Sequence, residues 1–192
     1  MRVEINTHDS VITPEAVLII GTYDENGVPN AMNAAWGTQT DFNEITISLS
    51  KHKTTENIEK TGAFTVSFGT ESTVTISDYF GIESGKKVNK IEKAGCHVHK
   101  SENVNAPIIE EYPLTLECKL KSWNPEEGIL VGEIVAEQAD ESIMTDGDVD
   151  LDKLKPIIYD SAIKAYRGVG PVIAKAFEEG FKIKQSVDKW DN

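Results

Sequence analysis

The sequence predicts a mainly antiparallel β-fold with short helices, either a barrel or a sandwich. Most of the clear hydrophobic segments repeat with a period of two residues, and turn-forming residues separate several of them. Helical segments are few, and the strands do not alternate with long helices. A doubly wound parallel sheet is therefore disfavoured.

The predicted strands are of two kinds. Ala16 to Tyr23 is a nearly continuous apolar run, which is typical of a strand buried on both faces, and Asn26-Gly27 after it predicts a tight turn. Other segments alternate apolar and polar residues, which predicts strands with one apolar and one polar face. These are residues 45–49, 64–68 and 114–120, and a further β-rich stretch covers 129–136 after a turn at 124–128.

Three short helices are expected. Lys53–Lys60 starts with hydroxyl residues suited to a helix N-terminus, and Thr73–Phe80 is a second candidate. Val172 to Phe177 follow Pro171 at helical spacing, with Gly180 as a stop signal. The polar segment 140–155 is expected to be a surface excursion, and residues 185–192 a loosely held tail.

Length and composition indicate a folded chain with one domain, residues 1–192, and a core from about 13 to 181. The net charge of −13 disfavours nucleic acid and anionic membranes as partners. No apolar run is long enough for a membrane span or a secretory signal, so we expect a cytoplasmic protein. The two cysteines, Cys96 and Cys118, are expected to be buried or half-buried thiols.

The segment from Asn30 to Asn57 is the strongest candidate for a binding site. It places hydroxyls and amides beside Lys51, His52 and Lys53 at a predicted helix start, which is a suitable environment for a phosphate group. The alternative is that Thr54 or Thr55 only caps the helix.

Earlier in this segment, the small residues Asn33, Ala34 and Ala35 would let a flat ligand approach the backbone. Trp36 could form a wall of the site, and its alternative role is that of an ordinary core aromatic residue.

In order and spacing, the chain resembles the flavin reductase family, whose members fold as an FMN-binding split barrel. The resemblance covers about residues 13 to 181. It is carried by Asn33-Ala34-Ala35-Trp36, Ser48-Leu49-Ser50, Lys53-Thr54-Thr55-Glu56-Asn57-Ile58, Thr61 to Ser67, Ala106 to Leu114 with Leu116-Glu117-Cys118, and Tyr166 to Gly170.

The resemblance implies a flavin site. Asn33, Ala34, Ala35 and Trp36 would border the ring and ribityl chain, and Ser48, Leu49 and Ser50 would contact the flavin from the neighbouring strand. Lys53, Thr54, Thr55 and Asn57 would hold the phosphate. The resemblance also implies a homodimer with flavin sites near the subunit interface, where Tyr166 is a candidate to reach the partner's site.

Signals for other functions are weak. Asp146 to Asp152 lacks the glycine and the final glutamate of a calcium loop, which favours a solvated acidic loop. Cys96, His97 and His99 have no second pair of zinc ligands. Gly168-Val169-Gly170 is only a fragment of a dinucleotide fingerprint and indicates a turn before a helix. Hydrolase and NTPase motifs are absent from the sequence.

The expected function is that of an FMN-binding oxidoreductase, with FAD as the alternative flavin. It would accept hydride from NAD(P)H as a transient co-substrate and pass electrons to free flavin or another acceptor. Because the flavin ring itself transfers hydride, no catalytic side chain is assigned. A flavoredoxin-like electron carrier with a redox protein partner is the alternative, and a cofactor-free barrel used as a binding module is a more remote one.

Overall fold

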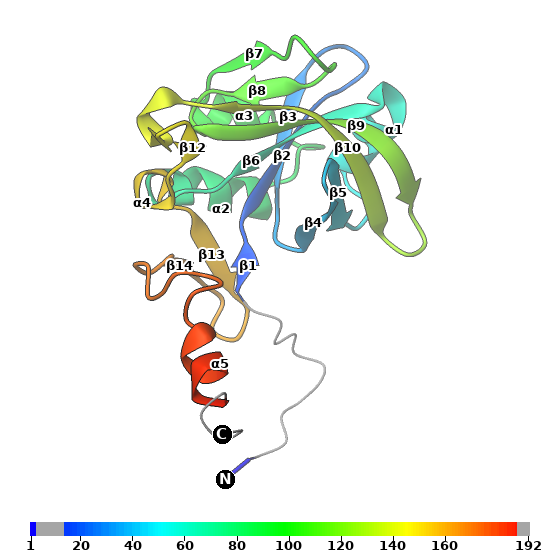
Figure 1. Ribbon diagram of the computed structural model, residues 1–192. Helices are drawn as coiled ribbons and strands as arrows, with labels where there is room; N and C mark the ends of the chain where they lie inside the picture. Colours follow the sequence, from blue (N-terminus) through cyan, green and yellow to red (C-terminus); the bar gives the residue numbers. More distant parts are fainter. Residues whose placement is uncertain (3–13, 188–192) are drawn as a thin grey trace.

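A seven-stranded antiparallel sheet dominates the computed structural model, which describes residues 1–2 and 14–187, the last three by their backbone alone. Its strand order is β3-β2-β6-β9-β10-β5-β4, and it curls into a half-barrel (Figure 1). The strands are β2 (Leu18–Tyr23), β3 (Pro29–Ala34), β4 (Gly37–Asp41), β5 (Glu44–Ser48), β6 (Ala63–Phe68), β9 (Leu114–Asn124) and β10 (Ile129–Ala139). The predicted antiparallel, split-barrel fold with short helices is confirmed.

Smaller elements surround this sheet. A three-stranded sheet contains β1 (Glu15–Ala16), β13 (Ile157–Asp160) and β14 (Ala165–Gly168); β7 (Val98–Lys100) pairs with β8 (Pro107–Ile109), and β11 (Met144–Thr145) with β12 (Asp148–Val149). The α-helices are α1 (Lys53–Thr61), α2 (Val74–Ile82), α3 (Lys90–Ala94), α4 (Leu151–Leu154) and α5 (Phe181–Val187), and the 3₁₀ helices are η1 (Glu71–Thr73) and η2 (Glu141–Ile143).

The strand β2 separates two hydrophobic cores, as its continuous apolar run predicts. Leu18 and Ile20 face the core inside the curl, whereas Val17, just before the strand, and Ile19 face the core that includes residues of α2 and α3. Alternation along a strand sends successive side chains to opposite faces, so a strand packed on both sides needs apolar residues throughout. Helices α1, α2 and α3 also contact β3, which positions their ends around one side of that strand.

Both predicted turns are present where expected. Between β2 and β3, the Asp24 carboxylate accepts hydrogen bonds from the backbone N–H groups of Asn26 and Val28, both at 2.9 Å, and Gly27 adopts a φ of +77°. Between β9 and β10, Gly128 adopts a φ of +71° and its N–H donates to the Asn124 carbonyl. The left-handed conformation at both positions is the reason for glycine there.

The predicted helix from Val172 to Phe177 is wrong. Residues 171–175 have no regular structure, turns cover 176–180, and α5 begins after Gly180, where the sequence indicated a stop. Ile173 and Phe177 are each 96% exposed, so within residues 14–187 these apolar side chains have no surface to pack against. A short helix without packing is marginal in water, and Phe177 has a φ of +63°, which is incompatible with a helix.

The predictions for the acidic segment 140–155 and for the C-terminal tail are confirmed only in part. The predicted surface excursion 140–155 contains η2, β11, β12 and α4, with Ile143 and Leu154 buried. Of the predicted tail, 185–187 belong to α5, and 188–192 lie outside the described residues, as do 3–13. Cys118 is buried and Cys96 half-buried, as predicted. Within the described ranges, none of the helices has the length and apolar character needed to cross a membrane.

A fully buried carboxylate, Glu117 on β9, holds the loop that follows β7. It accepts hydrogen bonds from Ser101 Oγ, from Asn103 Nδ2 at 3.1 and 3.2 Å, and from Gln138 Nε2 at 2.6 Å. Burial raises the pKa of this carboxyl, but the hydrogen bonds outweigh burial and leave its pKa below the usual value. The ionised form is therefore the one that stabilises the fold.

Replacing Glu117 with Gln is expected to lower the free energy of unfolding by about 2 kcal/mol at pH 7, because a charged acceptor is lost from a buried network. A depressed folded pKa stabilises the protein above the unfolded pKa, about 4.3 for Glu, and this stabilisation disappears as the pH falls through the folded pKa. The difference between wild type and variant in urea unfolding should thus shrink below about pH 4.3. The exposed Glu126→Gln is the control, and a difference that stays constant at acid pH would contradict this role.

Candidate functional site

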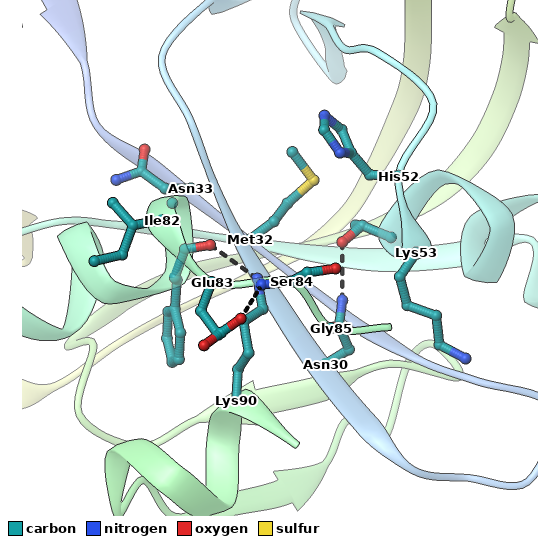
Figure 2. A pocket seen from close by; sticks show the side chains of 13 residues that line it. Asn30, Met32, Asn33, His52, Lys53, Ile82, Glu83, Ser84, Gly85 and Lys90 are labelled. Atoms are coloured by element: carbon teal, nitrogen blue, oxygen red, sulfur yellow. Dashed lines mark hydrogen bonds between the residues drawn. The ribbon is translucent and has the colours of Figure 1, made fainter. Parts of the chain in front are cut away.

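A pocket of about 270 Å³ lies where β3, the start of α1 and the segment after α2 meet. Asn33 and Ile82 lie on one side, His52 and Lys53 on the other, and Lys90 approaches from below in the view of Figure 2. Its other lining residues are Asn30, Met32, Thr54, Phe80, Gly81, Glu83, Ser84 and Gly85. The pocket thus combines two amides, two hydroxyls, two ammonium groups and one carboxylate in a chain whose net charge is −13.

Lys90 is the most deeply placed cation of this pocket. Its side chain is 4% exposed, and its ammonium group donates a 2.8 Å hydrogen bond to the Phe80 carbonyl (Figure 2). Burial lowers the pKa of Lys90 to about 8, although the nearby Glu83 carboxylate opposes this shift. A buried ammonium of this kind gains by contact with an anion, since an anion offsets the cost of its desolvation.

The start of α1 supplies the other donors. The Lys53 ammonium lies 3.4 Å from the Asp24 carboxylate, so it is only loosely paired. The buried Thr54 hydroxyl accepts a 2.9 Å hydrogen bond from the Asn30 amide, which leaves its own proton available to another acceptor. Backbone N–H groups at a helix N-terminus also carry partial positive charge. Together with Lys90, these groups form a suitable environment for a phosphate.

The predicted ring-side residues do not all reach the pocket. Asn33 lines it, and its amide donates to the Ser77 carbonyl at 2.8 Å. Ala35 lines a second, adjoining pocket, whereas Ala34 faces the core inside the curl. Trp36 is 59% exposed and its indole N–H donates to Glu15 at 2.8 Å, so the alternative of a core aromatic residue is wrong. Trp36 lines neither of these two pockets.

The residues predicted on the neighbouring strand and deeper in α1 are engaged within the chain. The N–H of Ser48 donates to the Trp36 carbonyl, and that of Leu49 to the Gly128 carbonyl. Ser50 is exposed and outside the pocket. The Thr55 hydroxyl bonds the backbone of His52, which is the capping role considered as the alternative, and the Asn57 amide donates to the Thr22 hydroxyl. Their contact with a flavin stays a prediction.

A second pocket of about 360 Å³ continues from the first, because Asn33, Gly81 and Ile82 line both. Its other lining residues are Ala35, Asp78, Tyr159, Lys164 and Tyr166. The Tyr166 hydroxyl donates to the Asp78 carboxylate at 2.9 Å, and burial together with Asp78 raises the pKa of Tyr166 to about 12. We call the first the central pocket and this one the tyrosine pocket.

Two parts of the central pocket were not predicted from the sequence. The segment Phe80–Gly85 and Lys90 come from α2, the segment after it and the start of α3, far along the chain from residues 30–57. No local motif marks Lys90 as a ligand residue. Only the folded arrangement shows that its ammonium lies beside the Phe80 carbonyl at the pocket.

Of the candidate metal ligands, the two histidines are exposed and paired with carboxylates, and Cys96 is half-buried. His97 Nδ1 lies 2.9 Å from Glu111, and His99 Nδ1 lies 3.1 Å from Glu110. Over residues 1–2 and 14–187, no group of three or more His, Cys, Asp or Glu side chains is arranged to hold a metal ion.

Comparison with known proteins gives the family. The flavin reductase like domain matches residues 11–159, so this chain belongs to the flavin reductase-like family. Among solved structures, it is similar to the flavoredoxin of Desulfovibrio vulgaris (Miyazaki F), with 33% identity, a TM-score of 0.87 and coverage of 93% of this chain and 100% of that one. The flavoredoxin of Methanosarcina acetivorans shares 29% identity, with a TM-score of 0.85 and coverage of 95% and 99%.

A more distant likeness concerns the fold alone. An FMN-binding protein from Thermus thermophilus, solved with bound 1-cyclohex-2-enone, has 20% identity and a TM-score of 0.74, and the match covers 91% of this chain and 100% of that one. The family resemblance inferred from the sequence motifs is confirmed.

Proposed function

We propose that this chain binds FMN, with the phosphate in the central pocket and the ring toward the tyrosine pocket, and acts as a flavin-dependent oxidoreductase. The observation that carries the proposal is the convergence of Lys53, Thr54 and buried Lys90 on one pocket of an acidic protein. Ammonium and hydroxyl donors at a helix start fit a phosphate dianion. Similarity to flavoredoxins and to FMN-binding proteins supports this choice of ligand.

When bound, FMN would supply the hydride and electron transfer chemistry. The protein's own groups bind and orient the ligand: Asn30 fixes the Thr54 hydroxyl, and the Phe80 carbonyl fixes the Lys90 ammonium. At the tyrosine pocket, the phenol of Tyr166 stays protonated at neutral pH and is held by Asp78. Hydride would come from NAD(P)H, and the electrons would pass to free flavin or another acceptor.

The second candidate function is that of an electron carrier with tightly bound FMN and a redox protein partner. The similarity at 33% identity to a flavoredoxin favours it, and a surface with a net charge of −13 would suit a basic partner. In both cases we propose a homodimer, which sedimentation analysis of the purified protein would test.

Titration of the flavin-free protein with FMN tests the binding site. We expect the double variant Lys53→Ala with Thr54→Ala to bind FMN about tenfold more weakly, because a half-exposed charge and a hydroxyl donor are lost. Lys60→Ala, at the other end of α1, is the control and should bind as wild type does. An unchanged affinity in the double variant would place the phosphate elsewhere.

Anaerobic mixing of the FMN-loaded protein with NADH or NADPH separates enzyme from carrier. The reductase function predicts rapid bleaching of the flavin absorbance by one or both nucleotides. A flavin that stays oxidised under these conditions, but is reduced by a low-potential electron donor, would instead establish the carrier function.

A further inference from the structure

A third pocket extends the proposed flavin site beyond its phosphate end. Its volume is about 210 Å³, and Asn30, Lys53 and Gly85 line both this pocket and the central pocket. Its remaining lining residues are Asp24, Val28, Pro29, Lys86, Lys87, Val88 and Asn89. We call it the lysine pocket, because three lysines line it.

The three pockets form a continuous series. The tyrosine pocket shares residues with the central pocket, and the central pocket shares others with the lysine pocket, whereas the tyrosine and lysine pockets share none. A ligand that fills the series therefore has three successive parts. A planar ring would lie at the tyrosines, a phosphate at Lys90 and Thr54, and a further anionic group at Lys86 and Lys87.

A close contact holds the lysine pocket against the central pocket. Gly85 approaches Asn30 so closely that a Cβ atom at position 85 would lie 2.1 Å from Asn30 Oδ1. Asn30 is itself fixed by its hydrogen bond to Thr54. The segment with Lys86 and Lys87 is thus packed on the residues that form the phosphate end of the central pocket.

The charges of the lysine pocket favour an anion at Lys87. Lys86 is paired with Glu56 at 2.5 Å, and Lys53 is loosely paired with Asp24. Lys87 is exposed and has no ion pair within the described part of the chain. Its ammonium is therefore the cation that an incoming phosphate would meet without displacing a carboxylate.

The other lining groups fit a nucleoside. Asp24 is held ionised, since hydrogen bonds from the backbone of Val28 and Asn26 and the nearby Lys53 lower its pKa. Among the described residues its Oδ2 contacts only the Lys53 ammonium, at 3.4 Å, so it can accept a hydrogen bond from a sugar hydroxyl. Val28, 43% exposed, and Pro29 provide an apolar wall for a base. Phosphate, sugar hydroxyls and a flat base are the components of an adenylate group.

We propose that the lysine pocket binds the adenylate half of a dinucleotide whose other half either occupies the central and tyrosine pockets or lies against a flavin bound there. This inference rests on the proposed flavin site. The adenylate could belong to FAD, bound in the linear order of the three pockets, or to NAD(P)H bound beside FMN. In both cases Lys87 is the residue that favours a ligand with an adenylate group over one without it.

Titrations of the flavin-free protein with riboflavin, FMN and FAD test whether the adenylate belongs to FAD. Lys87→Gln should weaken FAD binding about fivefold while FMN binding changes by less than about twofold, since one exposed charge contact is lost. Lys87→Arg should retain the wild-type ratio, and Lys93→Gln, which removes a nearby exposed charge outside the pockets, is the matched control.

Whether the adenylate belongs to NAD(P)H is tested by reducing the FMN-loaded protein with NADH, NADPH and reduced nicotinamide mononucleotide, which lacks the adenylate. In that case Lys87→Gln should raise the half-saturating concentration of NADH or NADPH about fivefold but not that of the mononucleotide. The inference is overturned if neither the FAD to FMN ratio nor the dinucleotide to mononucleotide ratio changes. A wild-type protein that binds no flavin at all would instead overturn the proposed function.

Discussion

Replacing Lys90 with Met is expected to weaken FMN binding about a hundredfold at pH 7, which corresponds to about 2.7 kcal/mol. Lys90 is 4% exposed and uses one of its three N–H donors on the Phe80 carbonyl, so the others are available to a phosphate in the central pocket. A charge-assisted hydrogen bond in a desolvated place is stronger than one at the surface. Its loss should exceed the effect of removing the half-exposed Lys53.

The pH dependence of binding provides a second, independent measurement. Because burial lowers the pKa of Lys90 to about 8 despite Glu83, the ammonium of the flavin-free protein loses its proton as the pH rises through that value. Phosphate binds the protonated form, so FMN affinity should fall between pH 7 and about 9.5 in the wild type. In Lys90→Met the affinity should be low and flat over this range.

Two controls separate binding from folding. Lys93→Met changes an exposed residue of the same helix and should leave FMN affinity unchanged. Thermal unfolding of flavin-free Lys90→Met shows whether the unpaired Phe80 carbonyl disturbs the fold. A folded Lys90→Met protein with wild-type affinity and the wild-type pH profile would exclude Lys90 from the phosphate site.

The positions of many strands could be predicted from their alternation, but the burial of their polar faces could not: Thr65 is 0% and Ser67 1% exposed, because they form hydrogen bonds with Pro107 and Thr115. The alternation of Phe64, Val66 and Phe68 with Thr65 and Ser67 marks a strand, and Asn26-Gly27 marks the β2–β3 turn. By contrast, β4 reads Gly-Thr-Gln-Thr-Asp and lies at the sheet edge with little burial, so it has no apolar period to detect.

The candidate site could be predicted only where its residues are close in sequence. Lys53 and Thr54 lie in one helix start, and a helix start beside lysines is a local signal. Lys90 reaches the same pocket because α3 and α2 contact β3 and each other. The helix predicted at 172–177 is a local signal that failed. Its apolar residues have helical spacing, but no part of the described structure covers their side chains, so no helix forms there.

Replacing Phe64 with Ala is expected to reduce the free energy of unfolding by about 3–5 kcal/mol. Phe64 is among the largest fully buried side chains and lies in the core inside the curl. Gly132 on β10 faces its ring: a Cβ atom at position 132 would lie 2.4 Å from Phe64 Cζ. The ring therefore occupies the space that a side chain on β10 would otherwise fill.

This geometry predicts that the two positions are coupled. Gly132→Ala alone should cost about 1–3 kcal/mol, because its methyl group collides with a ring that has no room to move in a packed core. In Phe64→Ala the same methyl group enters vacated space, so the double variant should be more stable than the sum of the single effects predicts. Urea unfolding of the four proteins measures this coupling energy. Strictly additive effects would mean that the ring of Phe64 does not pack over Gly132.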